Sequence, residues 1–333
     1  TYITGYSKDY LEPLGLLKMD FLGLSNLTMI DEIIKNIKEH ENLNITFNNI
    51  PEEDKKTLSL FSNDDLEGIF QFESSGIKNF VKKMKPQNFL DLVSAISLYR
   101  PGTTDFLDEY LLRRNNKKEI NYFTKELEPI LKETYGIITY QEQIMQIARI
   151  IAGYTLGESD ILRRAISKKK EEALIKEKEK FIDSSIKNGY TKDLAEEIYN
   201  LILKFANYGF NKSHAVAYAM ISYKMAFLKT YFYKYFMLSL LNNSINDEEK
   251  LKEYIKDIRK KNIEIIKPSI NLSETKFILK DNTIICPLTI IKNLGINISS
   301  SIIKERENNK YKSFIDFVSR LDKRLINKKT LTS

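Results

Sequence analysis

Residues 204–235 read KFANYGFNKSHAVAYAMISYKMAFLKTYFYKY, a stretch with five lysines, ten aromatic residues and no acidic residue. The turn at 208–214 opens a run that predicts one long helix over about 214–242. Asn211 or Ser213 can cap it, and the N–H groups of its first turn, with Lys212 beside them, then form an anion site. Two interpretations stay open: a pocket for a phosphorylated ligand, or a capped core helix whose lysines are solvated.

The aromatic residues of this stretch divide into two groups. His214, at the start of the helix, is expected to act by shape or hydrogen bonding rather than as a cation. Tyr208, Phe210 and Tyr218 are near enough to the turn to stack on a base. Those farther along recur every four residues and are expected in the core: Tyr223, Phe227 and Tyr231.

Composition limits the possible classes of protein. A chain of 333 residues with 42% hydrophobic residues predicts a globular protein of about two to three domains or subdomains. No apolar run approaches the ~18 residues of a membrane span. One cysteine, Cys286, excludes an internal disulfide and fits the reducing cytosol. With only His40 and His214 besides, a Cys/His metal site is excluded, and any metal ligands are carboxylates, which favour magnesium.

The net charge of +7, from 52 basic and 45 acidic residues, suggests a nucleic-acid partner. Abundant Lys, Ile and Asn are also what an AT-rich genome encodes, so lysine counts carry little weight. The ten arginines are more informative, because a guanidinium binds phosphate through two hydrogen bonds. Four of them form adjacent pairs, Arg113-Arg114 and Arg163-Arg164.

The predicted fold is mostly α. A short strand at 14–24 precedes a helix at 25–39, and residues 51–114 predict helices broken at Gly68, Gly76, Pro86 and Pro101-Gly102. Short strands are expected within 263–288. The other helices are expected at about 127–133, 140–152, 171–187, 191–206, 247–261, 298–307 and 312–320, with one more starting at a capping box of Thr155 and Glu158. A start at Thr1 rather than Met suggests an excised piece of a longer protein.

Lys18 and Asp20 form the first candidate site. Side chains two apart in a strand share a face, so this lysine and carboxylate project together. Such a pair suits a magnesium–phosphate site, and the alternative is a surface ion pair.

The second candidate site is the arginine pair 163–164. Residues 163–170 hold five basic residues and no acid, and Asp160 can brace either arginine from the preceding turn. Arg164 and Lys168 are one helical turn apart and repel each other unless an anion lies between them. Contact with a triphosphate or with DNA phosphate is favoured over a solvated basic helix end.

Taken together and in this order, these motifs resemble one family, the α subunit of bacterial DNA polymerase III, of the DnaE type. The matching stretches are GLLKMDFLGLSNLT (15–28), GIFQFESSGIKNFVKKMKP (68–86), LYRPG (98–102), ITYQEQIMQIARIIAGYTLGESDILRRAISKKK (138–170) and FANYGFNKSHAVAYAMISYKMAFLK (205–229). The resemblance implies three regions: the end of a catalytic palm at 1–24, nucleotide-binding fingers at 25–268, and distal fingers with a degenerate helix–hairpin–helix-like region at 269–333.

The resemblance also implies the roles of single residues. Asp20 would be the catalytic aspartate that supplies the third metal ligand, the other two coming from an Asp-x-Asp motif that this chain lacks. His214 would sense the sugar, and Asn293 replaces a glycine expected in the hairpin, which puts phosphate binding there in doubt. The incoming nucleotide would contact Lys18, Arg100, Arg163, Arg164, Asn211, Lys212, Ser213 and His214.

The function so implied is template-directed DNA synthesis in the cytoplasm by two-magnesium nucleotidyl transfer from a dNTP to a primer 3′-hydroxyl. Its partners would be primer–template DNA, dNTP and, in the full protein, the sliding clamp and other replisome subunits. No membrane partner is expected. This chain alone is expected to be inactive, because one carboxylate cannot hold two ions. The alternative is a non-catalytic helical nucleic-acid-binding module. A phosphatase or kinase lacks support, since no Gly-rich phosphate loop appears.

Overall fold

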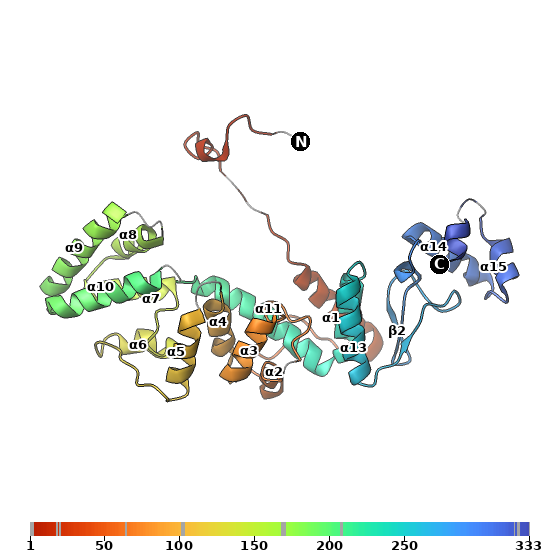
Figure 1. Ribbon diagram of the computed structural model, residues 1–333, viewed down its shortest axis with the longest axis horizontal. Coiled ribbons are helices and arrows are strands. Elements are labelled where there is room, and N and C mark those ends of the chain that lie inside the picture. Colours follow the sequence, from red (N-terminus) through yellow and green to blue (C-terminus); the bar gives the residue numbers. More distant parts are fainter. Residues whose placement is uncertain are drawn as a thin grey trace.

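The computed structural model describes residues 3–17, 19, 21–63, 65–100, 104–167, 171–206, 209–322, 324 and 327–332. Figure 1 shows an elongated molecule with helices α8, α9 and α10 at one end, α14 and α15 at the other, and α11 between them. The segment before α1 extends away from the helices.

The chain is mostly α, as predicted. The helices are α1 (Ser25–Glu41), α2 (Lys55–Leu60), α3 (Ser75–Met84), α4 (Phe89–Leu98), α5 (Thr104–Arg114), α6 (Glu128–Leu131), α7 (Gln141–Ile151), α8 (Leu156–Ser167), α9 (Glu171–Lys187), α10 (Lys192–Ala206), α11 (Lys212–Tyr231), α12 (Tyr233–Asn243), α13 (Glu248–Lys260), α14 (Ile296–Asn308), α15 (Phe314–Arg320) and α16 (Lys328–Leu331). Short 3₁₀ turns lie at Lys8–Tyr10, Lys132–Thr134 and Leu288–Ile290.

The short strands expected near the C-terminus are present. They are β1 (Ile265–Ile266), β2 (Ile278–Lys280) and β3 (Thr283–Ile285), in the order β1-β3-β2. Strand β3 pairs in parallel with β1 and antiparallel with β2.

Helix α11 lies at the centre of the packing. It packs against α2, α4, α1 and α12. Three of its polar side chains donate hydrogen bonds to backbone carbonyls of the segment 50–70: Ser222 to Phe70 (2.7 Å), Lys224 to Ile50 (2.8 Å), and Lys229 to Asp65 and Glu67 (3.1 and 3.0 Å). Ser222, Lys224 and Lys229 are all buried. They hold the segment 50–70, which includes α2, against α11 by donating to carbonyls that would otherwise be buried unpaired.

Three predictions about elements were wrong. The described residues of 14–24 contain no strand, because a strand needs a hydrogen-bonded neighbour and none lies beside them. The helix predicted over 214–242 is two helices, with Phe232 (φ −132°, ψ 44°) outside helical geometry between them. Gly76 lies inside α3 rather than ending it.

The buried apolar residues form two clusters. The larger cluster contains residues between Met29 and Cys286 in sequence, among them residues of the helices that pack against α11. The smaller joins Leu288, Leu294, Ile302, Tyr311 and Leu321. The division of the chain into three regions, with boundaries after residues 24 and 268, stays a prediction.

The turn before α14 bears on the helix–hairpin–helix-like region. Asn293 has φ +71°, the left-handed conformation that glycine adopts most easily and asparagine tolerates. Gly295 then precedes α14 as its N-cap. The backbone of the hairpin therefore does not require glycine at 293. In the described ranges, no helix is both long enough and apolar enough to cross a membrane.

Candidate functional site

The helices α7 and α11 begin side by side. Between them, the N–H of Phe210 donates to the carbonyl of Thr139 (2.9 Å), and the N–H of Gln141 donates to the carbonyl of Phe210 (2.9 Å). This short parallel bridge joins segments about seventy residues apart in sequence. Since the positive ends of two helix dipoles meet there, the bridge lies in a region that attracts negative charge.

The first turn of α11 already holds a carboxylate of the protein. Asn211 is the N-cap, and its side-chain oxygen accepts from the N–H of His214 (2.8 Å). The backbone N–H of Lys212 donates to both carboxylate oxygens of Glu142 at 3.1 Å, and the Asn211 amide donates to Glu142 at 3.2 Å. The prediction of a cap at Asn211 is confirmed, whereas the prediction of free N–H groups is wrong for Lys212 and His214.

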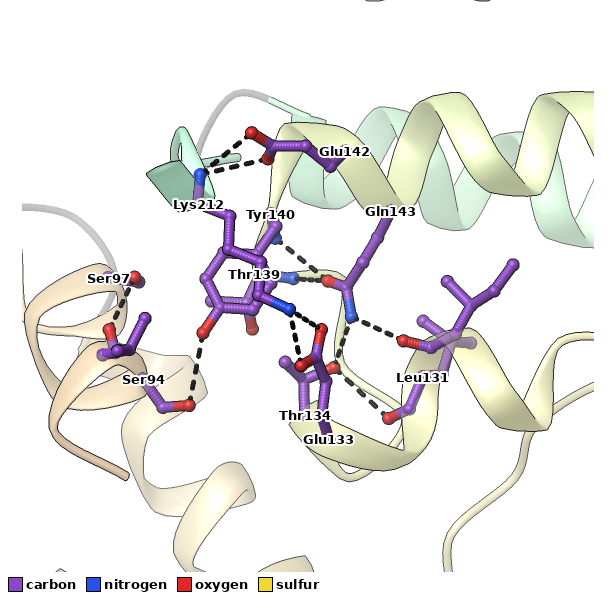
Figure 2. Close-up of polar contacts among 12 residues, drawn as sticks. Ser94, Ser97, Leu131, Glu133, Thr134, Thr139, Tyr140, Glu142, Gln143 and Lys212 are labelled. Carbon is purple, nitrogen blue, oxygen red and sulfur yellow. Dashed lines mark hydrogen bonds and ion pairs between the residues drawn. The ribbon is translucent and has the colours of Figure 1, made fainter. Parts of the chain in front are cut away.

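The side chain of Lys212 joins a second glutamate. Its ammonium group donates to the two carboxylate oxygens of Glu133 at 2.7 and 2.8 Å, and it lies 5.2 Å from the centre of the Tyr140 ring. Figure 2 shows this side chain running from Glu142 past Tyr140 to Glu133. Lys212 thus holds one carboxylate at each end, Glu142 on its backbone N–H and Glu133 on its ammonium group.

Gln143 fixes the segment that carries these glutamates. Its side-chain oxygen accepts from the N–H groups of Thr139 and Tyr140 (2.8 and 3.0 Å), and its amide donates to Ile130 and Thr134 (3.0 and 2.8 Å). Gln143 is buried, and both its side-chain oxygen and its amide group are hydrogen-bonded (Figure 2). These bonds make the segment around Thr139 and Tyr140 rigid. Burial also raises the pKa of the neighbouring Tyr140 phenol to about 12.

Gln141 joins the arginine pair to the turn before α11. Its side chain accepts a hydrogen bond from Arg163 (3.3 Å) and donates one to the carbonyl of Gly209 (3.2 Å). Gly209 leaves little room, since a Cβ there would lie 3.3 Å from the Gln141 side chain. Arg163 and the turn at 208–214 were predicted to share one site. The side chain of Gln141 contacts both, with Arg163 on one side and Gly209 of the turn on the other.

Asp160 braces both arginines, as predicted. One of its carboxylate oxygens lies 2.7 Å from Arg163 and the other 2.7 Å from Arg164. The hydrogen bond from Arg163, followed by the charges of both guanidinium groups, holds the pKa of the Asp160 carboxyl below its usual range. The Arg164 side chain is 66% exposed, so Asp160 orients its guanidinium without covering it.

Arg100 reaches the same turn from the end of α4. Its guanidinium lies 4.7 Å from the centre of the Phe210 ring, and its Nε donates to the carbonyl of Ser97 (3.1 Å). Burial lowers the pKa of Arg100. From Phe210 the ring contacts continue to His214 (5.5 Å between centroids) and then to Tyr218 (3.9 Å). His214 and Ser213 are both exposed in the first turn of α11.

Two predicted site residues lie outside the described residues, Lys18 and Asp20, and so does Tyr208. The expectation that Tyr231 is a core residue is wrong, since it is 43% exposed, while Tyr223 is buried as expected. The hydroxyl of Tyr231 donates to Asp54 (3.1 Å).

Four of the five lysines in the stretch 204–235 are bonded to groups from other parts of the chain. Lys212 pairs with Glu133, Lys234 with Glu41, and the buried Lys229 with Asp65 and Glu67. Lys224 is buried and bonded to Ile50. The carboxylates missing from this stretch are therefore supplied by other parts of the chain.

Carboxylate oxygens of Asp65, Glu67 and Asp257 lie within 4.8 Å of one another, a spacing that can hold a metal ion. The Lys229 ammonium lies 2.7 Å from Asp65 and 3.7 Å from Glu67, and Tyr233 donates to Asp257 (2.9 Å). Besides the buried Lys229, Lys261 lies 3.0 Å from Asp65 and Lys78 lies 2.9 Å from Glu67. Three lysines therefore already face the three carboxylates, so these residues do not fit a magnesium ion.

Sequence reasoning missed Glu133, Gln141, Glu142 and Gln143. An acid in the first turn of a predicted helix, here Glu142, is typical of helix starts and gave no sign of a role elsewhere. Only the three-residue spacing of Tyr140 and Gln143 pointed to a helix N-terminus. The contacts to α11 depend on tertiary structure.

Two helix N-termini, two arginines on α8 and an arginine–aromatic stack lie together in this helical part of the chain. Residues 26–189 match the family model described as the bacterial DNA polymerase III alpha subunit finger domain, and residues 262–333 match a helix-hairpin-helix motif. The chain is 43% identical over 330 residues to the DNA polymerase III subunit alpha of Bacillus subtilis and 44% identical over 332 residues to that of Staphylococcus epidermidis. Both matches cover 99% of this chain.

The chain therefore belongs to the family of bacterial DNA polymerase III alpha subunits. It spans about 30% of the length of these relatives, 30% for the Bacillus protein and 31% for the Staphylococcus protein.

Proposed function

We propose that this chain serves template-directed DNA synthesis by binding the incoming deoxynucleoside triphosphate. The proposed location is the cytoplasm of a bacterial cell. The observation that carries the proposal is the side chain of Gln141, which contacts Arg163 on one side and the turn before α11 on the other. Arg100, after α4, and Lys212, on α11, add positive charge beside this turn, where cations and the helix dipoles favour a phosphate group.

Each group has a distinct role in the proposed site. Arg163 and Arg164 bind the triphosphate, oriented by Asp160. The ring contacts from Phe210 to His214 supply a wall for the base and sugar, and His214 acts against ribonucleotides. These residues position the nucleotide rather than react with it.

Magnesium belongs to this proposal through Asp20, which would hold it with the two carboxylates of an Asp-x-Asp motif. When bound, magnesium supplies activation of the primer 3′-hydroxyl and stabilisation of the charge on the phosphates. Primer–template DNA, the sliding clamp and other replisome subunits are the proposed partners of the full-length protein.

The test compares arginine variants. Arg164→Ala is expected to weaken binding of dATP with magnesium by about tenfold or more, the effect of losing one charge-assisted contact. Arg149→Ala, on an exposed face of α7, is the matched control and should bind like wild type. Isothermal titration calorimetry measures the affinities. Equal affinities of the two variants would refute the proposed triphosphate site.

A second candidate function, nucleic-acid binding without chemistry, is favoured by the helix-hairpin-helix match and by the left-handed Asn293. It predicts duplex binding that weakens as salt rises and no affinity for triphosphates. The same calorimetry separates the two functions, since only the first predicts loss of dATP binding in Arg164→Ala with duplex binding largely retained.

A further inference from the structure

The charges around the start of α11 oppose a simple anion site. Arg100, Arg163, Arg164 and Lys212 bring four positive charges, whereas Glu133, Glu142 and Asp160 bring three negative ones, a net charge of +1. At Lys212 itself, the carboxylate of Glu133 lies against the ammonium group, and that of Glu142 lies against the backbone N–H. A triphosphate approaching Lys212 therefore meets negative charge first.

The two glutamates differ in what holds them. Glu142 accepts hydrogen bonds from the backbone of Lys212 and from the N-cap Asn211, so it fixes the start of α11. Glu133, in the short 3₁₀ turn Lys132–Thr134, accepts hydrogen bonds from the ammonium group at the end of the Lys212 side chain. The side chains of Lys212 and Glu133 are 33% and 31% exposed, so water can replace either partner.

We propose that Glu133 is a latch that competes with the phosphates of the nucleotide for Lys212. Without ligand, Lys212 is held on Glu133; when a triphosphate binds, the ammonium group leaves the carboxylate and joins a phosphate. The latch makes the affinity of the site lower than its cations alone would give, and it selects for ligands with enough negative charge to displace a carboxylate. This inference rests on the proposed function of the site.

The experiment measures dATP binding with magnesium by calorimetry, using the full chain. Glu133→Gln keeps the shape and removes the charge, and should bind dATP about threefold to tenfold more tightly, the effect of one screened charge pair. Glu128→Gln is the matched control, because Glu128 lies on α6 next to the same turn and pairs only loosely with Lys132 (3.9 Å). It should bind like wild type.

A double-mutant cycle connects the effect to Lys212. In a Lys212→Ala background, Glu133→Gln should change the affinity much less than it does in wild type. Weaker or unchanged binding by Glu133→Gln in the wild-type background would overturn the latch, since a carboxylate that merely orients Lys212 predicts weaker binding.

A ligand-free measurement separates failure of the latch from failure of the proposed function. Lys212 should be acetylated by acetic anhydride faster in Glu133→Gln than in Glu128→Gln, as measured by mass spectrometry. If no variant binds dATP, the proposed function fails and this labelling still tests the Glu133–Lys212 contact. Equal labelling of Lys212 in the two variants would overturn the latch.

Discussion

The ammonium group of Lys229 lies 2.7 Å from a carboxylate oxygen of Asp65, and the lysine side chain is fully buried. Lys229 also donates to the backbone carbonyls of Asp65 and Glu67. One of the two interpretations of the sequence leaves this lysine solvated. Instead, it joins α11 to a segment more than 160 residues away in sequence.

Replacement of this lysine should be costly. Lys229→Met keeps much of the side-chain volume but removes the buried ammonium group from Asp65 and Glu67, which keep only Lys261 (3.0 Å) and Lys78 (2.9 Å). It is expected to lower the free energy of unfolding by about 3–5 kcal/mol. Lys234→Met is the control, because Lys234 pairs with Glu41 at 3.1 Å with both side chains about one-third exposed. Its cost should be below about 1 kcal/mol. Urea denaturation measures both, and equal losses would contradict the role of Lys229.

The same cluster predicts an acid-sensitive stability. Burial alone would raise the pKa values of Asp65 and Glu67, but the charges and hydrogen bonds of lysines, Lys229 among them, lower both. Because the folded pKa lies below the unfolded value of about 4, the contribution is complete above that pH and is lost as pH falls through the folded pKa. Urea denaturation between pH 6 and 3 should show this decline.

A double variant tests the source of that decline. Asp65→Asn with Glu67→Gln should flatten the pH dependence of the free energy of unfolding. Asp322→Asn is the control: hydrogen bonds from Arg324 lower the pKa of its carboxyl to about 2, yet the residue lies on the exposed surface. If the control flattens the curve as much as the double variant, the buried cluster is not the cause.

His214 gives a prediction about sugar selection. Its ring contacts Phe210 and Tyr218 while the residue stays exposed at the start of α11. His214→Ala should reduce the preference for dATP over ATP by several-fold, with dATP affinity changed less. Calorimetric titration with both nucleotides gives the ratio. An unchanged ratio would assign His214 to packing alone.

Asn293 gives a prediction about duplex binding. At φ +71° a β-branched residue is strained, so Asn293→Val should distort the hairpin and weaken duplex DNA binding, whereas Asn293→Gly should preserve it. Fluorescence anisotropy with a labelled duplex at fixed salt measures both. Binding that is the same in the two variants would show that this hairpin does not contact the duplex.

Much of the fold could be predicted because the signals are local. The capping box of Thr155 and Glu158 forms as expected, with the N–H of Thr155 donating to Glu158 (2.9 Å) and the N–H of Glu158 to Thr155 (3.3 Å). The helix expected at 171–187 has those bounds. Helix periodicity and capping act within a few residues, so the sequence contains them.

The candidate site could be predicted only in part. The pairing of Asp160 with Arg163 and Arg164 follows from helical spacing and was foreseen. The glutamates on Lys212 and the burial of Lys224 and Lys229 were not, because they depend on side chains from distant segments. A run without acidic residues indicates only that its counter-ions lie elsewhere in the chain.

The pair of main-chain hydrogen bonds around Phe210 has a mechanical consequence. Since α7 and α11 both start at this bridge, neither helix can rotate about its own first turn without breaking a bond or carrying the other along. Any rearrangement of this region on ligand binding must therefore move the two helix starts as one body, with the pivot placed farther out along the chain.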